Sequence, residues 1–332
     1  MEKKFSTMFN AEGWFLYFVG ATLINMFAGF VSTILPFLIS NNLMATNLSF
    51  FISLGRGIIV IVLYALAYSK ALLAFLNTLS LAEKKFAISI DSNSFLFFVL
   101  ANVIISVVTL GLYAPWAVKA IIDKVLSNLK YEGEGSFSFR SKASSILGFL
   151  IIFIIVILFL TLLLGGSFVV AMKYSGSFAL LALLFAVVLG LAFFAMIAFW
   201  QVFLFNWFCN VQYTSAKKNT TYTLDINIGN AVFFCLGQLI LLIITLGFYV
   251  GVYQLNMYTY FCGRITEKEG NSIIGHMVFR KPNNKGATFL FLQAFLSVIS
   301  FGIYTPFALV EYAKFFINNT YLQTKNEEVF VV

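Results

Sequence analysis

Hydrophobic residues in this chain gather into long apolar runs that are separated by short polar segments. Two of the runs, ILGFLIIFIIVILFLTLLLGG (146–166) and FALLALLFAVVLGLAFFAMIAFW (178–200), exceed the roughly 18 residues that a helix needs to cross a bilayer. The pattern therefore predicts a helical membrane protein with several membrane segments.

Several segments between the apolar runs alternate apolar and polar residues, as a short half-buried strand does. They are FAISID (86–91), FSFR (137–140), YTLDIN (222–227) and MVFR (277–280). A lone strand leaves backbone groups unpaired, so we expect several strands to pair into a small sheet that ties the helices together.

One short motif ends three of the apolar runs, as TLGLYAPW (109–116), TLGFYVGV (245–252) and SFGIYTPF (300–307). In each copy a glycine precedes a tyrosine by two residues, and a second helical stretch follows. Glycine tolerates unusual backbone angles, and proline fits the first turn of a helix. We therefore predict a tight turn between two helices, built from Gly111, Tyr113, Pro115, Trp116, Gly247, Tyr249, Gly302, Tyr304 and Pro306.

The repeating unit is then strand, helix, turn, helix, strand. Five units are predicted within a single membrane domain covering 1–332, near 5–82, 86–131, 137–215, 222–270 and 278–322. The predicted fold class is an all-α polytopic membrane protein of parallel-repeat helical hairpins, with about ten membrane segments and short β-strands between units on the cytoplasmic face.

A rival interpretation keeps seven crossings, at 14–40, 49–76, 96–113, 142–165, 178–208, 228–249 and 287–304. The distribution of the basic residues distinguishes the hairpin interpretation from the seven-crossing interpretation. In the hairpin interpretation all of the 21 basic residues except Arg56, Lys70 and Lys173 lie on the side that carries the strands. Because Lys and Arg favour the cytoplasmic side, this distribution favours hairpins and places both termini in the cytoplasm.

The formal net charge of +8 has the same explanation, since only 10% of the residues are charged and 61% are hydrophobic. The expected partners of the basic residues are anionic lipid headgroups at the cytoplasmic face, and nucleic acid is not expected. A homo-oligomer or a protein partner is compatible with the pattern.

Catalytic chemistry has no support in the sequence. There is no Ser/His/Asp set, no H-E-x-x-H motif and no Rossmann fingerprint, and His276 has no second metal ligand nearby. We expect a protein that is not an enzyme and holds no cofactor or metal.

Polar residues at membrane depth are the candidate functional residues, because burying them in lipid is unfavourable. They are Arg56, Lys119, Asp123, Asn256, Glu311 and Lys314. Helix spacing predicts an ion pair between Lys119 and Asp123 and another between Glu311 and Lys314. These residues either line a permeation path or ligand site, or serve as polar contacts between helices, with Arg56 reaching the headgroups. The first reading favours a channel or transporter, which is the function we expect because polar groups recur at membrane depth. The second favours the alternative, a structural, interaction or lipid-binding protein of the envelope.

The stretches TLGLYAPWA and YEGEGSFSF, and again SFGIYTPFALVEYAKFFINNTYL, resemble the YjgN family of bacterial inner-membrane proteins, a domain of unknown function. The last unit keeps Pro306, Lys314, Asn319 and Thr320 of the family motif, whereas the second has Asp123 where an arginine is usual. The resemblance implies a bacterial inner-membrane location and no particular activity.

Overall fold

The computed structural model describes residues 2–11, 14–38, 42–131, 135–173, 176–216, 218–282 and 285–324. The described chain divides into two compact units. The first unit contains residues 2–137 and 280–321, and the second contains residues 138–279 and continues from Leu322. The termini at Met1 and 325–332, whose cytoplasmic location the sequence predicts, lie outside the described residues.

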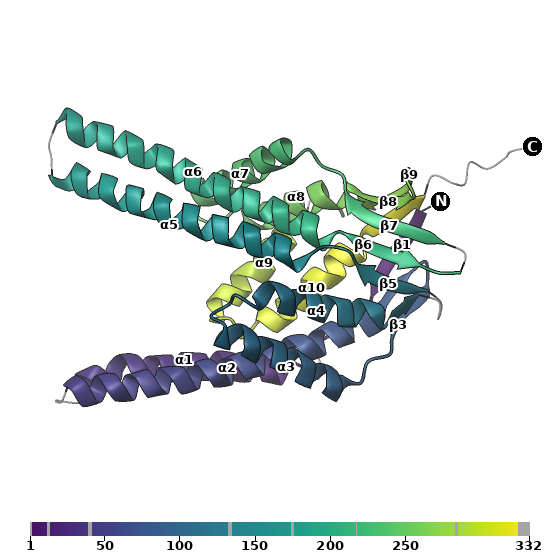
Figure 1. Cartoon of the computed structure of the whole chain (residues 1–332), viewed down its shortest axis with the longest axis horizontal. Helices are drawn as coiled ribbons and strands as arrows, with labels where there is room; N and C mark the ends of the chain where they lie inside the picture. Colours follow the sequence, from purple (N-terminus) through teal and green to yellow (C-terminus); the bar gives the residue numbers. More distant parts are fainter. Residues whose placement is uncertain are drawn as a thin grey trace, which may run out of the picture. The chain divides into compact units, whose positions relative to one another are not determined.

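The first unit holds three helical hairpins and the strands at their ends (Figure 1). Its helices are α1 (Phe15–Leu38), α2 (Asn42–Thr78), α3 (Ser92–Val108), α4 (Ala114–Ser127), α9 (Gly286–Ile299) and α10 (Thr305–Ile317). Its strands are β1 (Glu2–Thr7), β2 (Leu79–Leu81), β3 (Lys84–Ile88), β4 (Leu129–Tyr131) and the start of β10 (Thr320–Thr324). The hairpin of α1 and α2 extends well beyond the tip of α3 and α4 (Figure 1).

The second unit holds the other two hairpins. Its helices are α5 (Ala143–Lys173), α6 (Ser177–Phe208), α7 (Ile228–Ile244) and α8 (Val250–Cys262), and its strands are most of β5 (Ser136–Phe139), β6 (Val211–Thr214), β7 (Asn219–Leu224), β8 (Ile265–Glu269), β9 (Ser272–Phe279) and the end of β10. Along the described chain the order strand, helix, helix, strand occurs five times.

The expectation of an all-α protein is wrong, because the described strands pair into an extensive antiparallel sheet. In the first unit the strand order is β4-β3-β2-β1-β10, and in the second it is β10-β9-β8-β7-β6-β5. Neighbouring strands satisfy the backbone groups that a lone strand leaves unpaired, as in the antiparallel register of Phe86 with Tyr131 and of Tyr222 with Glu267. The result is a mixed protein in which a sheet joins the hairpin ends.

The expectation of about ten membrane segments is also wrong. Four described helices contain segments long and apolar enough to cross a membrane: Phe15–Ile34 in α1, Asn47–Thr78 in α2, Ala143–Ser167 in α5 and Ser177–Phe208 in α6. The six helices beside the glycine–tyrosine turns have 13 to 17 residues. At 1.5 Å per residue they reach roughly 20–25 Å, which is less than the ~30 Å of a bilayer core.

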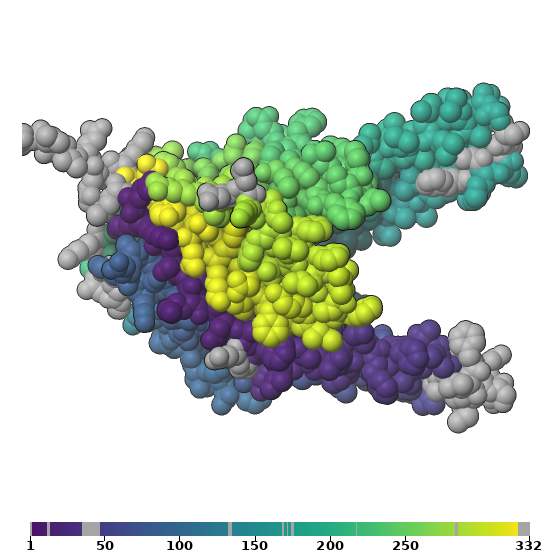
Figure 2. Space-filling model, turned by 180° about the vertical axis from the view of Figure 1, so that it is seen from behind, coloured from purple at the N-terminus to yellow at the C-terminus, as the bar shows by residue number. Residues whose placement is uncertain are grey.

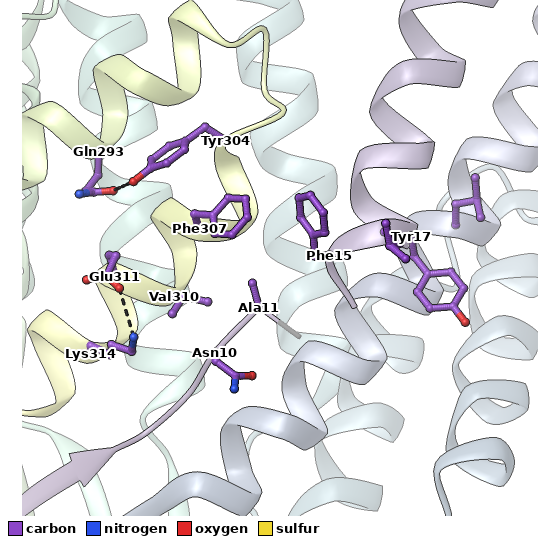
Figure 3. Close-up of a pocket in the computed structure, with 12 residues that line it drawn as sticks. Asn10, Ala11, Phe15, Tyr17, Gln293, Tyr304, Phe307, Val310, Glu311 and Lys314 are labelled. Carbon is purple, nitrogen blue, oxygen red and sulfur yellow. Dashed lines mark hydrogen bonds and ion pairs between the residues drawn. The ribbon is translucent and has the colours of Figure 1, made fainter. Parts of the chain in front are cut away.

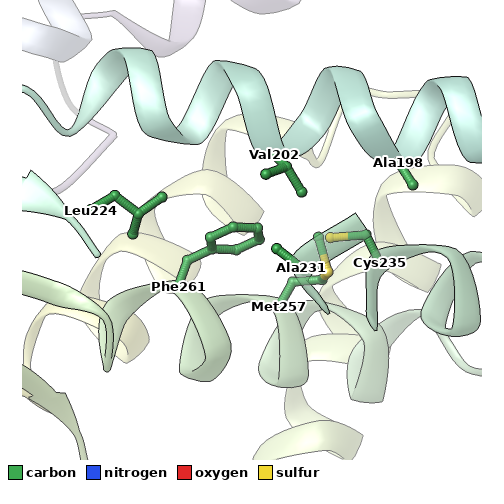
Figure 4. Close-up of a cluster of buried hydrophobic side chains, with 7 residues drawn as sticks. All are labelled: Ala198, Val202, Leu224, Ala231, Cys235, Met257 and Phe261. Carbon is green, nitrogen blue, oxygen red and sulfur yellow. The ribbon is translucent and has the colours of Figure 1, made fainter. Parts of the chain in front are cut away.

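Each unit has its own hydrophobic core. In the first unit Trp14 and Ala67 are completely buried among Phe9, Phe18 and Val310. In the second unit α6, α7 and α8 meet around Val202, Cys235 and Phe261 (Figure 4). The first of these cores fixes the start of α1 against α10, where the candidate site lies. Figure 2 shows α10, in yellow, beside the purple N-terminal segment.

Candidate functional site

The three glycine–tyrosine turns share one backbone conformation. The residue before each glycine has a left-handed φ of +52°, +50° or +51°, and the glycine has +86°, +88° or +89°. A φ near that of the glycine is one that residues with a side chain rarely adopt, which explains why glycine occupies this position. The prediction of a tight turn between two helices is confirmed at residues 109–113, 245–249 and 300–304.

Every backbone N–H of the turns and of the residue that follows each one (109–114, 245–250 and 300–305) has a partner. In the first turn, for example, Gly111 N–H donates to the Ser106 carbonyl at 2.7 Å, and Tyr113 N–H donates to Thr109 Oγ1 at 3.1 Å. Thr245 and Ser300 accept the corresponding bonds in the other turns, at 3.1 and 2.9 Å. A turn with no unpaired donor can be transferred from water into an apolar environment, because none of its backbone N–H groups loses a hydrogen bond in the transfer.

The tyrosine of each turn bonds back to the preceding helix, eleven residues earlier. Tyr113 donates to Asn102 at 3.3 Å, Tyr249 to Gln238 at 3.0 Å and Tyr304 to Gln293 at 2.8 Å. These bonds hold the two helices of each hairpin together just behind the turn.

The tips of the turns are apolar and exposed. Leu110, Leu246 and Phe301 have exposed fractions of 93%, 87% and 74%. Such side chains are unfavourable in water unless a partner or a lipid covers them.

A pocket of about 1220 Å³ lies in the first unit, between the start of α1 and helix α10 (Figure 3). Most of its wall is apolar. Phe15 and Phe307 face each other there with ring centroids 5.0 Å apart. The other lining residues are Asn10, Ala11, Leu16, Tyr17, Leu63, Gln293, Tyr304, Val310, Glu311 and Lys314.

One side of the pocket carries opposite charges. Lys314 Nζ donates to Glu311 Oε1 at 3.2 Å, and both side chains are more than a third exposed. The Gln293–Tyr304 hydrogen bond adds a neutral polar group on the same side (Figure 3). Tyr17, on the α1 side, accepts a hydrogen bond from Lys70 at 3.2 Å. The pocket therefore has an apolar wall and a zwitterionic edge.

The structure brings together only two of the predicted polar residues in this pocket, Glu311 and Lys314. Both predicted ion pairs are confirmed, and the second, between Lys119 and Asp123 on α4, has an N–O distance of 2.7 Å. That pair does not line the pocket.

The other two predicted residues have local roles in packing. Asn256 donates to Gln238 and to Tyr249, each at 3.1 Å, and so reinforces the α7–α8 hairpin. The guanidinium group of Arg56 packs against Gly29 of α1: a Cβ added to Gly29 would lie 2.7 Å from Arg56 Nη1. The sequence pattern did not indicate Phe15 as a site residue, because its contact with Phe307 joins positions nearly 300 residues apart.

The described part of the chain contains no group of three or more His, Cys, Asp or Glu side chains that could hold a metal ion. Its four apolar helices are compatible with a membrane protein. The class that the fold defines is a mixed protein of apolar helical hairpins whose ends carry an antiparallel sheet.

Comparison with known families identifies the chain further. Residues 15–288 match the family described as bacterial protein of unknown function, DUF898, which is the YjgN-like family. The chain belongs to this family, which confirms the resemblance seen in its turn motifs. No match to the chain was found among the curated proteins or among the solved structures.

Proposed function

We propose that this protein is a multi-pass protein of the bacterial inner membrane that binds a membrane lipid between α1 and α10. The α1–α2 and α5–α6 hairpins each cross the bilayer and return. Because each makes an even number of crossings, the strands at their ends stay on one side. The excess of basic residues around those strands supports a cytoplasmic location for that side and for both termini.

The three short hairpins enter the bilayer from the cytoplasmic side without crossing it. Their length, their exposed apolar tips and their fully bonded turns support this arrangement. In the first unit, a Cβ added to Gly302 would lie 3.7 Å from Thr22 of α1. Thr22 is seven residues beyond the start of the α1 segment, so this tip reaches roughly 10 Å into the apolar layer.

The pocket beside Phe15 and Phe307 is the observation that carries the lipid-binding proposal. It lies where the apolar segment of α1 begins, at Phe15, and therefore at the level of the lipid headgroups. Its apolar wall suits the upper part of an acyl chain. Its volume of about 1220 Å³ holds far more than an ion or a small polar solute.

The charged edge of the pocket favours a zwitterionic headgroup. Glu311 can accept hydrogen bonds from a primary ammonium group, and Lys314 can donate to a phosphate oxygen. A headgroup such as phosphoethanolamine carries both groups. Its binding would exchange the intrahelical Glu311–Lys314 contact for two contacts with the lipid.

Lipid binding to the purified full-length chain tests this proposal. Native mass spectrometry with added dioleoyl phosphatidylethanolamine should show a retained lipid, and Glu311→Gln should reduce its affinity by about tenfold, since a charge-assisted hydrogen bond contributes roughly 1.5–3 kcal/mol. Phosphatidylglycerol, which lacks the ammonium group, should respond much less to Glu311→Gln.

The Lys119–Asp123 pair provides a matched control, because it is a helical ion pair in the same unit that does not line the pocket. Asp123→Asn should leave lipid binding unchanged. Equal binding of both lipids by the parent chain and by Glu311→Gln would refute the proposal.

Transport, the function that the sequence favours, stays a prediction. The polar residues proposed to line its path engage partners within their own helix or hairpin: Lys119 with Asp123, and Asn256 with Gln238 and Tyr249. Lipid binding therefore has the more direct support.

A further inference from the structure

A second pocket, of about 360 Å³, lies within the second unit, where β5 leads into α5 and α6 leads into β6. Its lining residues are Arg140, Ser141, Lys142, Ser145, Phe203, Asn206, Trp207, Asn210, Thr223 and Leu224. It shares no residue with the pocket between α1 and α10.

Reciprocal hydrogen bonds hold the two junctions together. Ser141 Oγ donates to the Trp207 carbonyl at 2.8 Å, and Trp207 Nε1 donates to the Lys142 carbonyl at 3.0 Å. Arg140 N–H donates to the Asn210 carbonyl at 3.0 Å. These bonds use backbone groups of Arg140 and Lys142, so the framework is fixed without their charged ends. The Trp207 ring is buried against Phe139 at 4.5 Å between centroids.

The lining is cationic. Arg140 and Lys142 carry positive charges, and no lining residue in the described part of the chain is acidic. Ser145, Asn206 and Asn210 add hydroxyl and amide groups that can donate hydrogen bonds. The 31-residue helix α5 begins at Ala143, so the positive end of its dipole lies at the same place. This combination differs from the first pocket, where Glu311 offsets Lys314.

We propose that this pocket binds a phosphate group, either in the headgroup of an anionic phospholipid or as a free phosphate anion. Arginine offers a planar pair of donors to phosphate oxygens, and lysine adds a mobile charge. The pocket lies at the ends of two segments able to cross a membrane, Ala143–Ser167 and Ser177–Phe208. This position suits a lipid phosphate at the membrane surface.

The test uses the full-length chain in detergent, with dioleoyl phosphatidylglycerol and dioleoyl phosphatidylcholine compared by native mass spectrometry, and inorganic phosphate titrated by calorimetry. Arg140→Gln and Lys142→Gln should each weaken phosphatidylglycerol binding by about tenfold, and the double variant by roughly a hundredfold. Lys142→Arg should retain most of the affinity.

The two sources of phosphate give different results. If a lipid headgroup is bound, millimolar inorganic phosphate will leave phosphatidylglycerol in place. If free phosphate is bound, it will bind the parent chain at micromolar concentration and lose affinity in the same variants. Either result supports the phosphate site.

Lys85→Gln is the control, because Lys85 is an exposed lysine on β3 of the other unit. Lys85→Gln should change neither the affinity for phosphatidylglycerol nor the affinity for inorganic phosphate. Wild-type binding of both probes by the double variant overturns the inference. Equal binding of the two lipids by the parent chain overturns it when the parent chain also fails to bind inorganic phosphate. Should the double variant fail to fold, the two single variants decide, since both must weaken binding. Glu311→Gln should leave this site intact, so the two proposals can fail independently.

Discussion

Replacing Thr245 tests whether the glycine–tyrosine turns depend on complete backbone hydrogen bonding. Thr245 Oγ1 accepts the Tyr249 N–H at 3.1 Å and donates to the Leu241 carbonyl at 2.8 Å. Thr245→Val keeps the shape of the side chain but removes this oxygen. Thr245→Ser keeps the oxygen, as Ser300 does naturally in the third turn, where it accepts from Tyr304 at 2.9 Å.

The expected magnitude follows from the single donor that loses its partner. Leaving a fully buried N–H without a partner is unfavourable by about 1–3 kcal/mol; because the Tyr249 N–H is half-buried, Thr245→Val should destabilise the chain by about 1 kcal/mol, the lower end of that range. Thr245→Ser should stay within about 0.5 kcal/mol of the parent. For domains of 150–250 residues, 1 kcal/mol corresponds to a shift of about 2–4 °C in the melting midpoint.

Thermal unfolding in detergent, followed by circular dichroism, measures the difference. Thr245→Val should melt several degrees below Thr245→Ser, and Ser300→Ala should melt below Ser300→Thr for the same reason. If the valine and serine variants melt together, the hydroxyl does not supply the bond that completes the turn, and the reasoning fails.

Three further predictions concern the turns and the sheet. Gly247→Ala should destabilise the chain by about 1–2 kcal/mol, because its φ is +88°, whereas Gly237→Ala, within α7, should not destabilise it in the same melting assay. Burial raises the pKa of Tyr222, and the Glu267 carboxylate raises it further. Because the folded chain then holds the phenol proton more tightly, stability should decline as the pH rises above about 10, and Tyr222→Phe should reduce this decline in unfolding measured between pH 9 and 11. Leu246→Trp should add fluorescence that brominated acyl chains quench in reconstituted vesicles, because Leu246 is 87% exposed at an apolar tip.

Each of these predictions has a definite contrary result. Equal melting of the two glycine variants would remove the special role of the turn backbone. An unchanged alkaline decline in Tyr222→Phe would assign that decline to other groups. Failure of brominated lipids to quench the added tryptophan would place the α7–α8 tip outside the bilayer.

Local features of the fold were predictable from the sequence. The turn residues Gly111, Gly247 and Gly302 occupy the predicted tight turns, because a left-handed backbone requires glycine and so marks its own position. Alternation located the strands within a few residues, as for FSFR at 137–140, which forms β5 at Ser136–Phe139. Ion pairs at i, i+3 and i, i+4 follow from helix geometry alone.

The features that depend on distant residues were not predictable. The apolar run that ends at Val108 continues the pattern of a spanning helix, yet α3 has only 17 residues once the turn is excluded. Strand alternation does not specify a partner, so the extent of the sheet was missed. The pocket needs Phe15 beside Phe307 and Tyr17 near Lys70, and no local pattern links these positions.

The pairing of the first strand with the last has a consequence for biosynthesis. Strand β1 neighbours β10, and Thr7 N–H donates to Asn318 Oδ1 at 2.8 Å across 311 positions. During translation β1 leaves the ribosome before the five hairpins, whereas its neighbour β10 is made after them. Closing so long a segment is slow, so β1 must wait with an open edge until the intervening hairpins have been made. Throughout that interval the nascent chain exposes a surface that a chaperone or a neighbouring nascent chain can occupy.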